Sequence, residues 1–154
     1  MALVIGILVL LVVAFEALQG ASAPWTIAGV ASNAGFAGSD LVIAVAIAYA
    51  ESSGNPNAEG DKDANGNPTS IGLWQIHFTV HPEFDEQSLY DPQYNANAAF
   101  SIYTAAGNSF SPWTTFGSGK YQNYSDQAQS DVNDLSADDS TDDSTDDSGD
   151  GQDG

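Results

Sequence analysis

Residues 41–54 read LVIAVAIAYAESSG, and this stretch decides the fold. Ten apolar residues rich in alanine suit a buried helix better than a strand. Ser39 or Asp40 is the expected N-cap, and Gly54 followed by Pro56 ends the predicted helix. The anomaly is Glu51, a charged residue that directly follows the apolar run.

Two effects at the position of Glu51 raise the pKa expected for its carboxyl group. The C-terminus of a helix carries partial negative charge, and apolar neighbours disfavour the ionised form by desolvation. A carboxylic acid that keeps its proton near neutral pH can donate it in catalysis. From position alone, an exposed glutamate that ends a helix is an equally good interpretation.

The rest of the central segment also favours helices. Asp91 as N-cap and Pro92 at the first helical position predict a second helix, which ends at Gly107. A shorter helix is expected between residues 29 and 38. The segment 55–70 is rich in Gly, Asn, Asp and Pro, which predicts a long loop or a small hairpin. The expected fold class is therefore mainly α.

The composition divides the chain into three parts. Residues 24–125 are mixed in composition and form the predicted globular domain. Residues 1–15 hold no charged side chain, so residues 1–23 are interpreted as a signal sequence, a retained anchor or an assembly helix, with a helix of the domain core as the alternative. Residues 126–154 hold 11 aspartates and no lysine or arginine, which predicts a disordered acidic tail.

The charge balance excludes several classes of function. The chain has 21 acidic and 2 basic residues, a formal net charge of −19 and no cysteine. Binding to nucleic acid or to anionic lipid headgroups is excluded, as are disulfides and thiolate chemistry. Residues 1–125 still carry −8. This favours adaptation to high salt, where the Debye length falls to about 3 Å, over an ordinary acidic protein with an acidic tail.

Three motifs follow one another along the chain: ESSGNP at 51–56, SIGLWQI at 70–76 and YNANAAFSIY at 94–103. SPWTTF at 111–116 and GKY at 119–121 follow them. Together they resemble the lytic transglycosylase and goose-type lysozyme family, and this variant is similar to the muralytic domains of phage and virus tails. The resemblance implies an α+β lysozyme-like fold.

The resemblance also implies roles for particular residues. Glu51 matches the catalytic acid, Ser70 and Gln75 match groups that line the saccharide groove, and Tyr103 matches a tyrosine whose hydroxyl lies near the acid. In this family one glutamate protonates the glycosidic oxygen and then takes a proton back. The N-acetyl group or 6-hydroxyl of the substrate completes the reaction, so no enzyme nucleophile is required.

Two aromatic residues are added to this site from their chemistry. Trp113 and Tyr121 offer flat faces on which sugar rings can stack, and plain core positions are the alternative. No second carboxylate is obviously placed as a partner of the acid. The candidates are Asp61, Asp63, Asp85 and Asp91.

Two further patterns suggest metal ligands. Asp61, Asp63 and Asn65 resemble the first half of a calcium loop, but the closing glutamate would fall at Gly72, so calcium and a plain turn both remain open. His77 and His81 have a spacing that two zinc ligands can use on a helix. The proline that follows and the missing zinc-protease glutamate favour a structural or surface role. No cofactor is required, and calcium is an optional ligand.

The sequence therefore predicts cleavage of a β-1,4-linked amino-sugar polymer, peptidoglycan or another envelope glycan, by the single general acid/base Glu51. The predicted location is a virion tail or the cell envelope, where cleavage would aid virus entry or envelope remodelling. Residues 1–18 would contact a membrane or tail proteins. The alternative is a non-catalytic structural or glycan-binding component of the same assembly.

Overall fold

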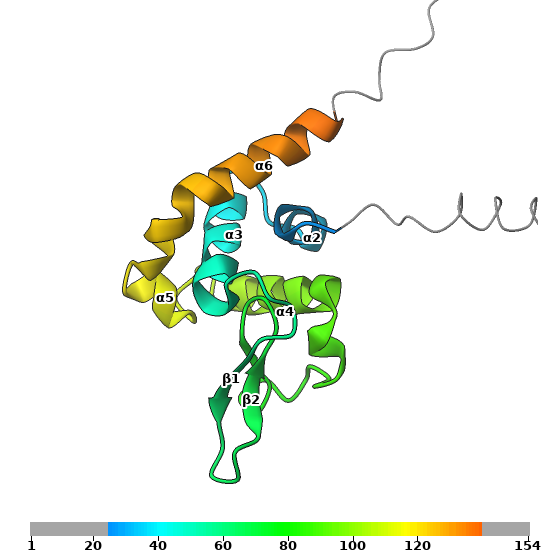
Figure 1. The fold of residues 1–154 in the computed structure, drawn as a ribbon, viewed down its shortest axis with the longest axis vertical. Helices are drawn as coiled ribbons and strands as arrows, with labels where there is room; N and C mark the ends of the chain where they lie inside the picture. Colours follow the sequence, from blue (N-terminus) through cyan, green and yellow to red (C-terminus); the bar gives the residue numbers. More distant parts are fainter. Residues whose placement is uncertain (1–24, 140–154) are drawn as a thin grey trace, which may run out of the picture.

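The computed structural model describes residues 25–139, and its fold is mainly helical with one small sheet, as predicted (Figure 1). The elements in chain order are α2 (Ile27–Ala34), α3 (Gly38–Ser52), β1 (Glu59–Lys62), β2 (Pro68–Ile71), β3 (Ile76–His77), η1 (Ser88–Tyr90), α4 (Pro92–Ala105), α5 (Thr114–Gly117), η2 (Lys120–Tyr124) and α6 (Ser125–Asp139). The interpretation of residues 1–23 falls outside the described residues. Among residues 25–139, no helix has both the length and the apolar character that a membrane span requires.

Helix α3 forms the centre of the core. Residues 44–48 are buried completely or almost so, and α2, η2 and α6 pack around the helix. The helix begins earlier than predicted. Its N-cap is Ala37, which has an extended backbone and forms no side-chain capping hydrogen bond, and not Ser39 or Asp40. It ends as predicted, where Ser53 and Gly54 adopt left-handed backbone conformations, with φ of 54° and 77°.

Helix α4 confirms the predicted second helix. The carboxylate of Asp91 accepts a hydrogen bond of 2.8 Å from the backbone N–H of Tyr94, and Pro92 occupies the first helical position. Gly107, with φ of 77°, follows the C-cap Ala106. The helix packs against α2, and its buried alanines complete the core on that side.

The segment between α3 and α4 contains the hairpin that the sequence offered as one of two alternatives. Strands β1 and β2 are antiparallel with Gly60 opposite Ser70, and β3 adds to β2 with Ser70 opposite His77. In Figure 1 the β1–β2 hairpin extends away from the helices. The hairpin and α3 together frame the candidate site described below.

Helix α6 overturns the prediction that disorder begins at residue 126. Ala128 is fully buried, and Val132 and Leu135 pack against the core, a spacing that gives the helix one apolar stripe. The helix lies across α2 and α3 (Figure 1). In the sequence this apolar stripe is difficult to recognise, because most of the surrounding residues are polar or acidic. The folded unit therefore extends to Asp139 instead of ending at 125, and residues 140–154 lie outside the described part.

Candidate active site

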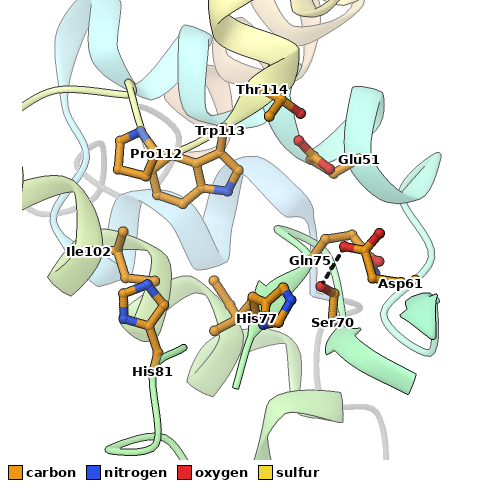
Figure 2. A pocket seen from close by; sticks show the side chains of 12 residues that line it. Glu51, Asp61, Ser70, Gln75, His77, His81, Ile102, Pro112, Trp113 and Thr114 are labelled. Atoms are coloured by element: carbon orange, nitrogen blue, oxygen red, sulfur yellow. Dashed lines mark hydrogen bonds between the residues drawn. The ribbon is translucent and has the colours of Figure 1, made fainter. Parts of the chain in front are cut away.

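A hollow of about 350 Å³ lies beside the end of α3 (Figure 2). Its lining comes from α3, from the hairpin with β3, and from the segments around residues 81, 102 and 113. The lining residues are Glu51, Gly60, Asp61, Ser70, Gln75, Ile76, His77, His81, Ile102, Pro112, Trp113 and Thr114. Three of the predicted site residues, Glu51, Ser70 and Gln75, therefore meet in one place, and Trp113 joins them.

Glu51 is the penultimate residue of α3 and is half-buried. Its Oε1 accepts a hydrogen bond of 2.7 Å from the hydroxyl of Thr115. Burial raises the pKa of Glu51 above the ordinary value of 4.5, and the negative charge of Asp61 raises it further. The hydrogen bond from Thr115 and the charge of Lys120 act in the opposite direction, but the net pKa shift is upward. The expected direction of the shift is thus found.

Two tryptophans fix the segment that carries Thr115. The indole Nε1 of Trp74 donates to the carbonyl oxygen of Ala44 in α3, at 2.9 Å. The indole Nε1 of Trp113 donates in turn to the carbonyl oxygen of Trp74, also at 2.9 Å. Trp113 is only 6% exposed, so it serves chiefly as a wall of the hollow. Stacking of a sugar on this ring stays a prediction.

Asp61 is the second carboxylate of the hollow. The sequence offered four candidates for this position and did not distinguish among them. Ser70, itself 2% exposed, donates its hydroxyl to Asp61 Oδ2 at 3.1 Å and so directs this carboxylate (Figure 2). The side-chain amide of Gln75 donates to the carbonyl oxygens of Ala58 and Gly72, at 3.0 and 2.9 Å. Ser70 and Gln75 therefore build the hairpin wall, and Asp61 supplies its charge.

Asn95 connects the second and third motifs. It is completely buried in α4, and its Nδ2 donates to the carbonyl oxygens of Ile71 and Leu89. Its Oδ1 accepts from the backbone N–H of Trp74, and all three hydrogen bonds are 2.9 Å long. Gly72, with φ of +83°, leaves no room there for a Cβ atom. Asn95 is not among the residues predicted for the site, although an amide among the alanines of a buried helix is a usable signal.

Tyr103 is not where the resemblance implied. Its hydroxyl donates to Asp40 Oδ2 at 2.6 Å, in the first turn of α3. With a rise of 1.5 Å per residue, Asp40 and Glu51 are separated by about 16 Å along the helix. The ring of Tyr103 packs against Phe36 and Phe110 instead of facing the hollow. The expectation that its hydroxyl lies near the acid is wrong.

Tyr121 is also absent from the lining of the hollow. It stacks on Phe116 with ring centroids 5.1 Å apart, so its exposed area is limited by this contact. The core interpretation, which the sequence left open beside sugar stacking, accounts for this position.

His77 and His81 line the hollow, although their sequence context favours a structural or surface role. His77 Nδ1 forms a hydrogen bond of 2.9 Å with the Thr79 hydroxyl, and His81 Nδ1 lies 3.1 Å from Glu83 Oε1. Figure 2 shows both imidazoles beside the hollow, on the side away from Glu51. The pairing of His77 with Ser70 across the sheet explains why the first of them faces the site.

The residues of the suggested calcium loop have other roles in the hairpin. Asp61 faces the hollow, whereas the Asp63 carboxylate accepts from the backbone N–H groups of Asn65 and Asn67 at 2.8 and 2.9 Å. Within residues 25–139, no group of three or more His, Cys, Asp or Glu side chains is arranged to hold a metal. Calcium binding by Asp61, Asp63 and Asn65 stays a prediction. The hydrogen bonds of the hairpin turn account for the presence of Asp63 and Asn65 without a metal.

The lysozyme-like domain family has a model that matches residues 28–115, more than half of the chain. The chain belongs to this family. Its members are typically glycosidases or transglycosylases, which indicates glycan cleavage in general. The match ends at Thr115, so η2 and α6 lie beyond it. No curated protein and no solved structure matches the chain.

Proposed function

We propose that this protein cleaves β-1,4-linked amino-sugar polymers of a cell envelope, with Glu51 as the single general acid/base. The observation that carries the proposal is the position of Glu51 at the edge of the hollow, half-buried and with a raised pKa. A raised pKa favours the protonated carboxyl group that a general acid needs. Membership of the lysozyme-like family supports the choice of a glycan as substrate.

The first step is proton transfer from Glu51 to the glycosidic oxygen. Thr115 donates to Oε1, so Oε1 is the acceptor in this pair and Oε2 is the oxygen left to carry the transferable proton. As the glycosidic bond breaks, positive charge develops at the anomeric carbon. The carboxylate of Asp61, held by Ser70 in the same hollow, stabilises that charge electrostatically.

The second step returns a proton to Glu51. Its carboxylate accepts the proton of the group that attacks the anomeric carbon. If the 6-hydroxyl of the substrate attacks, the product is an anhydro sugar. If water attacks, either directly or after the N-acetyl group has closed on the anomeric carbon, the product has an ordinary reducing end. Neither route requires a nucleophile from the protein.

A virion tail or the cell envelope is the proposed place of action. The proposal rests on the resemblance of the three motifs to muralytic tail domains and on the apolar run at residues 1–15. In this setting residues 1–18 would contact a membrane or other tail proteins, and the glycan would be peptidoglycan or another surface polymer.

The test is mass analysis of the products released from purified envelope glycan in molar salt. The wild-type chain should release fragments, Glu51→Gln should release none, and the control Glu59→Gln should act like the wild type, because Glu59 is an exposed residue of β1. Fragments lighter by one water than hydrolysis products indicate anhydro-sugar formation. If no variant cleaves but all bind the polymer, the non-catalytic alternative replaces the enzyme.

A further inference from the structure

The segment that follows the family match packs on the helix that carries Glu51. We call η2 and α6, Lys120–Asp139, the C-terminal clamp. Both parts of the clamp contact α3, and α6 also contacts α2 (Figure 1). The family match ends at Thr115, so the clamp lies outside the matched residues.

Tyr49 is the residue of α3 that the clamp holds. Its hydroxyl donates to Asp131 Oδ2 of α6 at 2.6 Å, and its ring stacks on Tyr124 of η2 with centroids 6.1 Å apart and an interplanar angle of 16°. Gly54 approaches the same ring so closely that a Cβ atom there would crowd it. Burial, the hydrogen bond and the charge of Asp131 raise the pKa of Tyr49 to about 12. The phenol is therefore fixed by α6, η2 and the end of its own helix.

Tyr49 and Glu51 lie on opposite faces of the same helical turn. Two residues along an α-helix correspond to a rotation of about 200°, so Tyr49 faces the clamp and Glu51 faces the hollow. The last turn of a helix lacks part of its hydrogen-bond partners and frays easily. The turn that carries Glu51 ends at Ser53, a non-glycine residue in a left-handed conformation, whose N–H donates to the carbonyl oxygen of Tyr49 at 2.9 Å. Tertiary contacts to Tyr49 therefore add to the stability of this turn.

We propose that the C-terminal clamp positions Glu51, with Tyr49 locked by Asp131 and Tyr124 so that the last turn of α3 keeps Glu51 against Thr115. Tyr49 and Asp131 are positioning residues in this account, because neither lines the hollow. The clamp also reaches the site through charge, since Lys120 at the start of η2 lowers the pKa of Glu51. The inference rests on the proposed function for its consequence in catalysis, but its test requires no substrate.

The test is a site-resolved NMR titration of the Glu51 carboxyl group in the full chain. Tyr49→Phe and Asp131→Asn should loosen the last turn and admit water, so the pKa of Glu51 should fall toward 4.5. The matched control is Asp134→Asn, which removes an equal charge one turn further along α6, from a residue that makes no bond to Tyr49. This control should leave the pKa unchanged.

An unchanged pKa of Glu51 in either clamp variant overturns the proposal, even if the thermal midpoint falls, because a merely structural contact lowers stability alone. An equal fall in the control also overturns it, because charge and not position would then be the cause. On a cleavable glycan, the clamp variants should lower kcat with little change in KM. Absence of cleavage in every variant would contradict the proposed function and leave the titration result standing.

Discussion

The two faces of the last turn of α3 carry similar hydrogen bonds but different ionisable groups. On one face the carboxylate of Glu51 accepts from the hydroxyl of Thr115 at 2.7 Å, and on the other the hydroxyl of Tyr49 donates to the carboxylate of Asp131 at 2.6 Å. Glu51 borders a hollow of about 350 Å³ together with Asp61, and Tyr49 borders another of about 330 Å³ together with Asp131 and Asp134. Neither bond length nor an adjoining hollow separates the two faces. They differ in the group at the hollow: the pKa of the Glu51 carboxyl group is raised from 4.5, whereas the pKa of the Tyr49 phenol is raised to about 12, too far above neutral pH for proton exchange in catalysis.

We call the side of α3 that carries Glu51 the hollow face and the side that carries Tyr49 the clamp face. The largest expected effect comes from replacing Glu51 on the hollow face. Glu51→Gln keeps the shape of the side chain but removes its transferable proton, so the initial rate of glycan cleavage should fall at least about a hundredfold. The rate of the Glu59→Gln control should stay within about twofold of the wild type, a change within the range of neutral surface substitutions. Equal rates for Glu51→Gln and the wild type would show that Glu51 is not the acid.

The same substitution has an effect on stability whose sign follows from the raised pKa. The carboxyl group of Glu51 loses its proton more readily in the unfolded chain, so its ionisation above pH 4.5 favours unfolding. Glu51→Gln should therefore equal or exceed the wild type in unfolding free energy at neutral pH. Its advantage should disappear as the pH falls below 4.5, where the glutamate is protonated in both states.

The next effect concerns the wall of the hollow. Asn95→Leu leaves the carbonyl oxygens of Ile71 and Leu89 and the N–H of Trp74 without their partner, at a cost of about 3 kcal/mol or more. Asn97→Ala on the exposed side of the same helix should change the unfolding free energy by no more than about 0.5 kcal/mol. Urea unfolding measures both, and similar values would contradict the role given to Asn95.

The hollow face was largely predictable from the sequence, and the clamp face was not. The apolar run of residues 41–50 and the Asp91 cap identified α3 and α4, the loop composition offered the hairpin as one of two alternatives, and the three motifs placed Glu51, Ser70 and Gln75 in one site. These signals are local, since each depends on a few neighbouring residues.

The errors share a different cause, which is contact between residues distant in sequence. Tyr103 bonds Asp40 at the far end of α3, where Phe36 from the segment between α2 and α3 packs against the aromatic residues of α4, and no local pattern shows this. The buried side of α6 depends on three apolar residues, Ala128, Val132 and Leu135, among many aspartates. The high aspartate content of this segment led to a prediction of disorder, although the spacing of its three apolar residues fits a helix.

A smaller effect should separate the two faces by their response to salt. Helix α6 contains aspartates and no basic residue, so charge repulsion should weaken the clamp at low ionic strength. Hydrogen exchange of α6 amides should slow more than that of α4 amides when salt is raised from about 0.1 M to about 3 M, as the Debye length shortens. An equal response of both helices would contradict a salt-sensitive clamp.

The smallest effect is a change in alkaline stability on the clamp face. Since the pKa of Tyr49 is raised from 10.0 to about 12, the unfolded chain loses this proton first, and the unfolding free energy should decrease between pH 10 and pH 12. Tyr49→Phe should remove part of that decrease, while the two chains should keep a constant difference below pH 10. Parallel pH profiles up to pH 12 would show that the Asp131 bond does not stabilise the neutral phenol.

The central claim is that the end of α3 holds a carboxyl group with a raised pKa at the edge of the hollow, and a site-resolved carboxyl titration of the wild-type chain tests it most directly. The expected result is a pKa above 4.5 for Glu51, a pKa below 4.5 for Glu59, and a lower pKa of Glu51 in Asp61→Asn, where the neighbouring charge is removed. A pKa of Glu51 at or below 4.5 in the wild-type chain would contradict the account.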